Sequence, residues 1–99
     1  MKFFLAIFFF APIFGSPYPI IVEIGARTGE LTKQLATLFP AGAIYAFEEN
    51  DNNYELLGIA VRDFDNVWII RANGLSIHLE NWRLRHKIAP IDLIIVHPL

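Results

Sequence analysis

Apolar residues in this chain recur in short runs that are separated by segments of helical periodicity. The first run shows no polar alternation, as expected for a strand whose two faces are both covered by helices. The strands predicted from these runs are Ile20–Ile24, which contains one acid, Ala43–Phe47, Val67–Ile70 and Asp92–Val96, which begins at an acid. Strands that alternate with helices in this way predict an α/β fold.

Two of the intervening segments predict helices. The first is expected at Glu30–Phe39, where an apolar stripe follows i, i+4, i+7 and i+8 spacing at Leu31, Leu35, Leu38 and Phe39. Pro40 stops this helix. The second is expected near Asn52–Arg62, with Asp51 as its cap and with Tyr54, Leu57 and Val61 turned inward.

The segment Leu75–Lys87 fits both a helix and a strand, and we favour a helix that ends before Pro90. Right-handed crossovers then predict a partial Rossmann-like three-layer sandwich with a mostly parallel sheet. Counted from Ile20–Ile24, the strand order is 3-2-1-4. Ligands of such sheets bind at the carboxyl ends of the strands, where the order reverses between strands 1 and 4.

The first strand breaks into a glycine turn, Gly25–Gly29, and Glu23 stands two residues before its first glycine. The second strand ends in another acid, Glu48, which lies 19 positions after Gly29. Strand, glycine turn, helix, strand and acid is the layout of a nucleoside-binding half-fold. Its glycines let the backbone approach the ligand, and its second acid accepts hydrogen bonds from ribose hydroxyls. The alternative is a tight turn that binds no ligand.

The glycine spacing favours one class of nucleoside. Dinucleotide sites use G-x-G-x-x-G, and the turn Gly25–Gly29 lacks one glycine of that pattern. The carboxylate of Glu23 would repel a pyrophosphate but suits a ligand with an ammonium group. S-adenosylmethionine is such a ligand. A nucleotide-binding half of an oxidoreductase stays open as a weaker alternative.

Two motifs resemble those of class I S-adenosylmethionine-dependent methyltransferases. Glu23–Gly29 resembles their first motif, acid-x-Gly-x-x-x-Gly, and is most similar to the FkbM variety, Asp-x-Gly-Ala-Asn-x-Gly. Tyr45–Asn50 and Asn53–Leu57 resemble the FkbM stretch Ala-Phe-Glu-Pro-Asn-Pro-x-x-Tyr-x-x-Leu. The resemblance extends from Ile20 to Val96. Three residues depart from the pattern: Arg27 replaces Asn, Glu49 replaces Pro, and His97 replaces Asp.

The resemblance implies transfer of a methyl group from S-adenosylmethionine to an oxygen or nitrogen acceptor. Glu23 would bind the ammonium end of the cofactor, and Glu48 would bind the ribose. Asn73 would lie beside the adenine. The backbone beneath the cofactor would come from Gly25, Ala26 and Gly29. At the end of the fourth strand, His97 is the only plausible general base, and the alternative is a polar residue that merely ends the strand.

Composition and net charge limit the kinds of molecule that this chain is expected to bind. The chain has 99 residues, enough for one domain, and a formal net charge of −2, which argues against nucleic acid as a partner. A small-molecule cofactor is the expected partner. The basic cluster Arg83–Lys87 is more simply the solvated end of a helix. The chain has no cysteine, and its 3 histidines are scattered, so neither disulfides nor a metal site are expected.

The N-terminus has the pattern of a secretory signal peptide. Lys2 precedes an apolar run, Phe3–Phe14, that is followed by small residues. Residues 1–15 are therefore expected to be a signal, with the methyltransferase-like domain at 16–99. Export conflicts with the cytosolic supply of S-adenosylmethionine. The alternatives are an amphipathic or buried N-terminal segment, a mispredicted start codon, or a tether that leaves the domain in the cytoplasm and is its only contact with a membrane.

The fourth strand stands at the end of the chain, and its far edge, Leu93–Val96, is apolar and without an expected partner. The fold of the family continues with further strands. We therefore expect a fragment whose missing C-terminal half, or self-association, covers this edge. A non-enzymatic reading competes with the enzyme: an inactive relic, or a secreted module that keeps the glycine turn only for folding.

Overall fold

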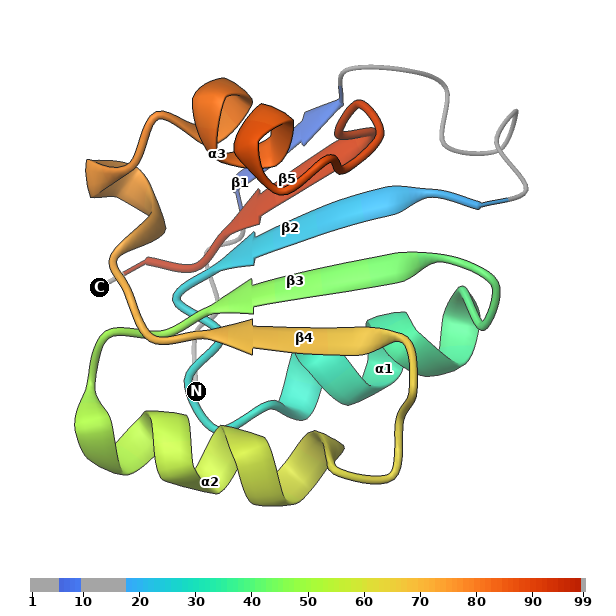
Figure 1. The fold of residues 1–99 in the computed structure, drawn as a ribbon. Helices are drawn as coiled ribbons and strands as arrows, with labels where there is room; N and C mark the ends of the chain where they lie inside the picture. Colours follow the sequence, from blue (N-terminus) through green and yellow to red (C-terminus); the bar gives the residue numbers. More distant parts are fainter. Residues whose placement is uncertain (1–5, 10–17, 99) are drawn as a thin grey trace.

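The structure is a computed structural model that describes residues 6–9 and 18–98 (Figure 1). Its strands are β1 (Ala6–Phe9), β2 (Ile20–Ile24), β3 (Ala43–Phe47), β4 (Val67–Ile70) and β5 (Leu93–Val96). Its helices are α1 (Glu30–Leu38), α2 (Asp51–Val61), the 3-10 turn η2 (Gly74–Ser76) and α3 (Leu79–Arg85).

The sheet has the order β1-β5-β2-β3-β4 (Figure 1). The four strands β2 to β5 are parallel, and their order is the predicted 3-2-1-4. The partial Rossmann-like fold is therefore confirmed. β1 adds a fifth strand that runs antiparallel to β5 and pairs Ala6 with Val96 through Phe9 with Leu93. The far edge of β5, predicted to lack a partner, is thus covered in this structure.

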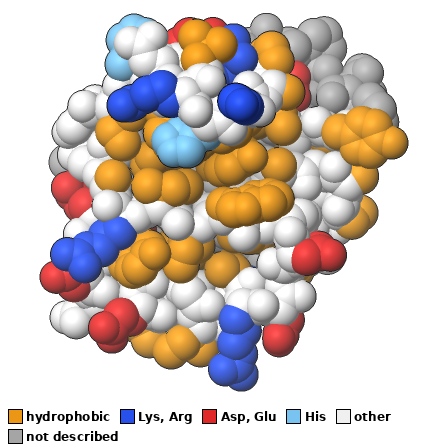
Figure 2. All heavy atoms as spheres, in the orientation of Figure 1, with side chains coloured by type: hydrophobic (Ala, Val, Ile, Leu, Met, Phe, Trp, Pro, Cys, Tyr) orange, Lys and Arg blue, Asp and Glu red, His pale blue; other side chains and the backbone are white. Residues whose placement is uncertain are grey.

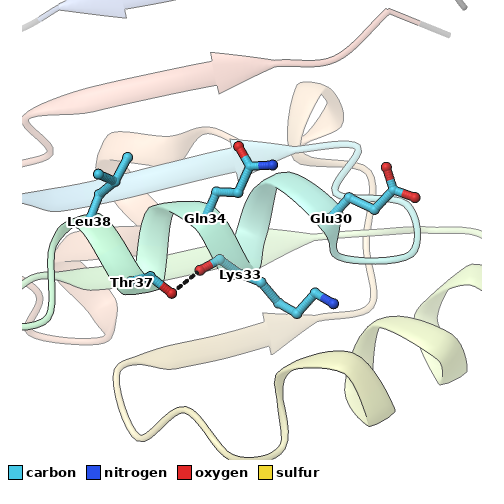
Figure 3. Close-up of a pocket in the computed structure, with 5 residues that line it drawn as sticks. All are labelled: Glu30, Lys33, Gln34, Thr37 and Leu38. Carbon is cyan, nitrogen blue, oxygen red and sulfur yellow. Dashed lines mark hydrogen bonds between the residues drawn. The ribbon is translucent and has the colours of Figure 1, made fainter.

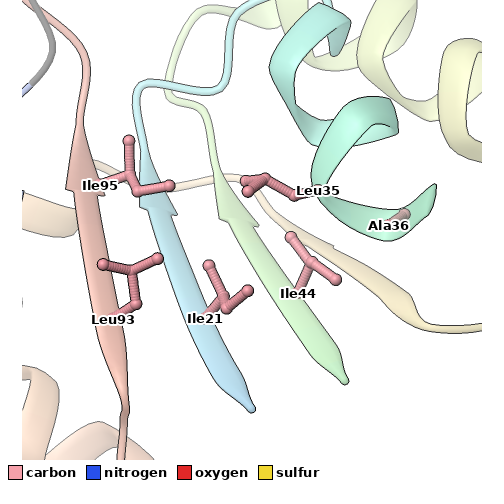
Figure 4. Close-up of a cluster of buried hydrophobic side chains, with 6 residues drawn as sticks. All are labelled: Ile21, Leu35, Ala36, Ile44, Leu93 and Ile95. Atoms are coloured by element: carbon pink, nitrogen blue, oxygen red, sulfur yellow. The ribbon is translucent and has the colours of Figure 1, made fainter. Parts of the chain in front are cut away.

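Helices cover both faces of the sheet, as the apolar runs predict. Along β2, Ile21 packs in a cluster with side chains of α1, whereas Val22 and Ile24 pack with Trp82 of α3. Figure 4 shows the α1 cluster, in which Leu35 faces the side chains of three parallel strands. Leu57 and Val61 anchor α2 on the same face as α1. Because side chains alternate along a strand, Glu23 points to the same face as Ile21.

The buried side of α1 differs from the predicted stripe. Leu38 is 70% exposed, so its predicted inward orientation is wrong, whereas Thr32, Leu35 and Ala36 are buried. Thr32 turns toward the sheet because its hydroxyl donates a hydrogen bond to the Glu23 carboxylate. Apolar periodicity alone could not indicate a polar contact of this kind.

Two helix boundaries also differ from their predictions. Asn50, and not Asp51, caps α2, because the Asn50 side chain accepts a hydrogen bond from the backbone N–H of Asn53 at 2.9 Å. The segment predicted as one helix from Leu75 divides into η2 and the short helix α3. His78 begins α3 by accepting the N–H of Asn81 on its Nδ1 at 3.2 Å.

Aromatic rings cover part of the α3 face. Tyr45 stacks on Trp68 with ring centroids 5.3 Å apart and meets the edge of Trp82 at the same distance. Figure 2 shows apolar side chains exposed over this face, beside Lys, Arg and His side chains. Burial raises the pKa of the Tyr45 phenol.

Within residues 6–9 and 18–98, no helix has the length and apolar character to cross a bilayer.

Candidate functional site

A pocket of about 230 Å³ lies at the carboxyl ends of the parallel strands. Each of these strands contributes to its lining: Gly25 follows β2, Glu48 follows β3, Asn73 follows β4 and His97 follows β5. This is the place where the order of the parallel strands reverses, as predicted for a ligand site. The volume is below the ~300–1,000 Å³ of typical ligand pockets, so the described residues form a shallower site than a typical ligand pocket.

A larger hollow lies elsewhere and has no comparable chemistry. Its volume is about 620 Å³, and the described residues that line it all come from one helix: Glu30, Lys33, Gln34, Thr37 and Leu38 (Figure 3). The hydroxyl of Thr37 is already bonded to the carbonyl oxygen of Lys33 at 2.8 Å. Side chains of a single helix surface do not converge on a ligand from several elements, so the pocket at the strand ends is the candidate site.

The glycine turn is held by hydrogen bonds within the chain. Gly25 and Ala26 both donate their N–H groups to the carbonyl oxygen of Phe47, at 2.9 and 3.0 Å. Arg27 donates its N–H to Glu48 Oε1 at 2.6 Å. In a dinucleotide site, N–H groups at this turn and the following helix end bind a pyrophosphate. Gly29 donates its N–H to the carbonyl oxygen of Ala26 at 3.2 Å, so four N–H groups of the turn are already bonded, which weighs against a dinucleotide.

The turn also requires unusual backbone angles. Gly25 and Gly29 have φ values of +76° and +94°, and Arg27 has a φ of +57°. These values lie in the left-handed region, where glycine is at ease and other residues are strained. Asn is among the residues best tolerated there, so the Arg27 departure from the FkbM pattern adds strain at this position.

Glu48 is the acid that reaches the pocket. Glu48 is 6% exposed. Its Oε2 accepts a hydrogen bond from the backbone N–H of Asn50 at 3.0 Å, and its Oε1 accepts one from the backbone N–H of Arg27. An ionised carboxylate has about four acceptor sites, so two remain after these bonds. Glu48 therefore links the glycine turn to the start of α2 and keeps acceptor capacity for ligand hydroxyls.

Glu23 lies behind the pocket and does not line it. It is fully buried, with an exposed fraction of 0%, and both of its oxygens are bonded. Oε1 accepts the hydroxyl of Thr32 at 2.5 Å, and Oε2 lies 2.7 Å from His97 Nε2. A buried carboxylate requires such partners, because desolvation without them is costly. Thr32 is a residue that sequence reasoning missed.

The remaining predicted residues divide between the pocket wall and the packing beneath it. Asn73 lines the pocket, and its side chain accepts the N–H of Leu75 at 3.0 Å. Ala26 is buried against α2. A Cβ on Gly29 would lie 3.0 Å from Leu57 Cδ1, so this glycine lets α2 pack closely. Within the described residues, no group of three or more metal-ligating side chains is present.

Comparison with known proteins agrees with the fold. The chain is 32% identical over 76 residues to ribosomal RNA small subunit methyltransferase A of Streptococcus sanguinis, and 34% identical over 76 residues to that of Streptococcus uberis. Each match covers 77% of this chain and 26% of the relative. This chain thus spans about a quarter of the curated relatives it matches. No protein-family model matches.

Two solved structures share the fold of this chain. Precorrin-6y C5,15-methyltransferase from Geobacter metallireducens superposes with a TM-score of 0.54 and 25% identity, over 60% of this chain and 34% of that one. The chain has a class I S-adenosylmethionine-dependent methyltransferase fold. A chain of the fibrillarin/Nop5p complex superposes with a TM-score of 0.62 and 22% identity, over 77% and 34% of the two chains.

These comparisons support S-adenosylmethionine as the cofactor of the methyltransferase-like domain. They add nothing to the FkbM type, which stays a prediction from the motifs. The curated relatives are named as ribosomal RNA methyltransferases, which runs weakly against the expectation that nucleic acid is excluded as a partner.

Proposed function

We propose that this domain binds S-adenosylmethionine at the carboxyl ends of the parallel strands and forms part of a methyltransferase. The observation that carries the proposal is Glu48, a buried acid with acceptor capacity left over at the pocket wall. The glycine turn supports it, because N–H groups that would otherwise bind phosphate are bonded within the chain. The proposed ligand has ribose hydroxyls for Glu48 and no phosphate for the turn.

The order of the pocket residues orients the ligand. The strands run β4, β3, β2, β5 across the sheet, and their ends place Asn73, Glu48, Gly25 and His97 in that order. With the ribose on Glu48, the adenine lies toward Asn73. The sulfonium and the amino-acid end then lie toward Gly25 and His97. Methyl transfer depends mainly on such positioning for in-line attack.

The acceptor in this proposal is an oxygen or nitrogen atom that approaches from the His97 side. RNA is a candidate because the curated relatives are ribosomal RNA methyltransferases. The proposal covers the binding half of the reaction, because this chain spans about a quarter of those relatives.

Calorimetric titration with S-adenosylhomocysteine and, separately, with NAD tests the proposal. S-adenosylhomocysteine should bind and NAD should not. NAD binding alone would favour the oxidoreductase alternative, and binding of neither ligand would favour a turn kept only for folding.

A pair of matched variants locates the binding. Glu48→Gln loses the charge and places an amide N–H₂ where a backbone N–H now donates, so affinity for S-adenosylhomocysteine should fall about tenfold. Glu49→Gln changes an exposed residue at the rim of the same pocket whose side chain makes no hydrogen bond among the described residues, and affinity should change little. Equal losses in the two variants would indicate a general charge effect and contradict the role of Glu48.

A further inference from the structure

A chain of buried hydrogen bonds connects α1 to the pocket. The Thr32 hydroxyl donates to Glu23 Oε1 at 2.5 Å, and Glu23 Oε2 lies 2.7 Å from His97 Nε2. The side chains of Glu23 and His97 are 0% and 8% exposed, so only the histidine reaches the pocket. The chain joins three elements that are distant in sequence and converge at the ends of β2 and β5.

The sheet register explains why these residues meet. β2 and β5 are parallel, with Glu23 opposite Ile95 and Ile24 opposite Val96. Because side chains alternate along a strand, His97 points to the same face as Ile95 and therefore to the same face as Glu23. The backbone N–H of His97 continues the ladder by donating to the carbonyl oxygen of Ile24 at 3.0 Å.

Hydrogen-bond chemistry then determines which imidazole nitrogen faces the ligand. An ionised carboxylate only accepts hydrogen bonds, so Nε2 of His97 carries the hydrogen atom and donates the hydrogen bond to Glu23 Oε2. In the neutral ring, Nδ1 is then an acceptor. Nδ1 has no hydrogen-bond partner among the described residues, and the ring is part of the pocket wall.

On the basis of the proposed cofactor, we infer that Thr32 and Glu23 hold the imidazole of His97 in position. Its Nδ1 then accepts a hydrogen bond from the amino group at the amino-acid end of S-adenosylmethionine. Glu23 itself does not touch the ligand, because it is fully enclosed and both of its oxygens are bonded. Its negative charge acts through the imidazole, which it orients and polarises. Thr32 and Glu23 are therefore positioning residues, and His97 is the residue that binds the ligand.

Two ligands that share the nucleoside separate this role from a structural one. S-adenosylhomocysteine carries the amino-acid end, and 5′-methylthioadenosine lacks it. His97→Gln preserves a donor for Glu23, because the glutamine amide nitrogen occupies about the place of imidazole Nε2, but removes the Nδ1 acceptor. This variant should lose about tenfold in affinity for S-adenosylhomocysteine and keep its affinity for 5′-methylthioadenosine.

The positioning residues are tested in the same way. Glu23→Gln can still accept from His97 and donate to Thr32, so the fold is preserved while the charge is lost. It should weaken S-adenosylhomocysteine binding selectively and move the imidazole N–H proton resonance of His97 upfield. Thr32→Val should weaken the same ligand selectively, whereas Thr37→Val, a matched change on the outer side of α1, should change neither affinity.

The outcomes are distinct. If the parent chain binds neither ligand, the proposed function fails, and this inference fails with it. If the parent binds both ligands but His97→Gln weakens both equally or neither, the assignment of His97 to the amino group is wrong while the proposed function stands. If Glu23→Gln leaves both the imidazole resonance and the affinities unchanged, the positioning role of Glu23 is wrong.

Discussion

Replacing Gly29 by alanine adds only one methyl group but should destabilise the domain strongly. Gly29 has a φ of +94°, and an added Cβ would lie 3.0 Å from Leu57 Cδ1 and 3.2 Å from Ala60 Cβ. A left-handed alanine costs roughly 1–2 kcal/mol, and overpacking adds about 1–3 kcal/mol. Reduced freedom of the unfolded chain returns roughly 0.4–1 kcal/mol. The middle of these ranges gives an expected loss of about 3 kcal/mol, which corresponds to roughly 12–24 °C in Tm for a domain of this size.

Gly58→Ala is the matched control. Gly58 lies inside α2 and has no positive φ, and its added Cβ would meet only the flexible tip of Ile69, at 3.3 Å from Cδ1. Helix propensity favours alanine there by about 1 kcal/mol, so stability should be unchanged or slightly higher. Urea unfolding followed by tryptophan fluorescence measures both variants, with equal m-values as the check on two-state behaviour. A Gly29→Ala midpoint equal to that of the parent would show that neither the left-handed φ nor the close approach of α2 requires glycine at this position.

Three further predictions concern other parts of the chain. Arg27→Asn should raise stability by up to about 1 kcal/mol in the same urea assay, because Asn tolerates the φ of +57°, and a lower midpoint would contradict this. Because burial raises the pKa of Tyr45, the free energy of unfolding should keep the full contribution of the neutral phenol below pH ~10 and should fall as the pH rises further. The Tyr45→Phe variant should show a smaller fall. An equal fall in the variant and the parent would contradict the assignment to Tyr45. If the leader is a signal peptide, N-terminal sequencing of exported protein should find Ser16 or a residue close to it, and intact Met1 in a cytosolic fraction would overturn the export.

The parallel strands were predictable because each is a short apolar run bounded by turn or polar residues. The runs at Ile20–Ile24, Ala43–Phe47 and Val67–Ile70 have the predicted bounds, and the last strand begins one residue later, at Leu93. Their order followed from the handedness of the crossovers. β1 was not predictable, because its partner lies at the other end of the described chain and its apolar run is typical of a leader.

The candidate site was predictable as far as its motifs are local. The glycine turn and the acid at the end of β3 lie where the motifs place them, and the pocket forms at their junction. The bonds of Glu23 were not predictable, because they depend on the register of β2 with β5 and on the rotation of α1. The predicted apolar stripe of α1 gives no reason to bury a polar residue such as Thr32. The reason is its hydrogen bond to Glu23, which only the structure shows.

A titration with S-adenosylhomocysteine, followed residue by residue in ¹H–¹⁵N NMR spectra, locates the cofactor site on the sheet. If the cofactor binds at the ends of the parallel strands, the backbone signals that move should be those of Gly25, Arg27, Glu48, Asn73 and His97. The signals of Lys33, Gln34 and Thr37, on the outer side of α1, should stay in place. Spectra that do not change, or changes confined to the outer side of α1, would contradict a cofactor site at the strand ends.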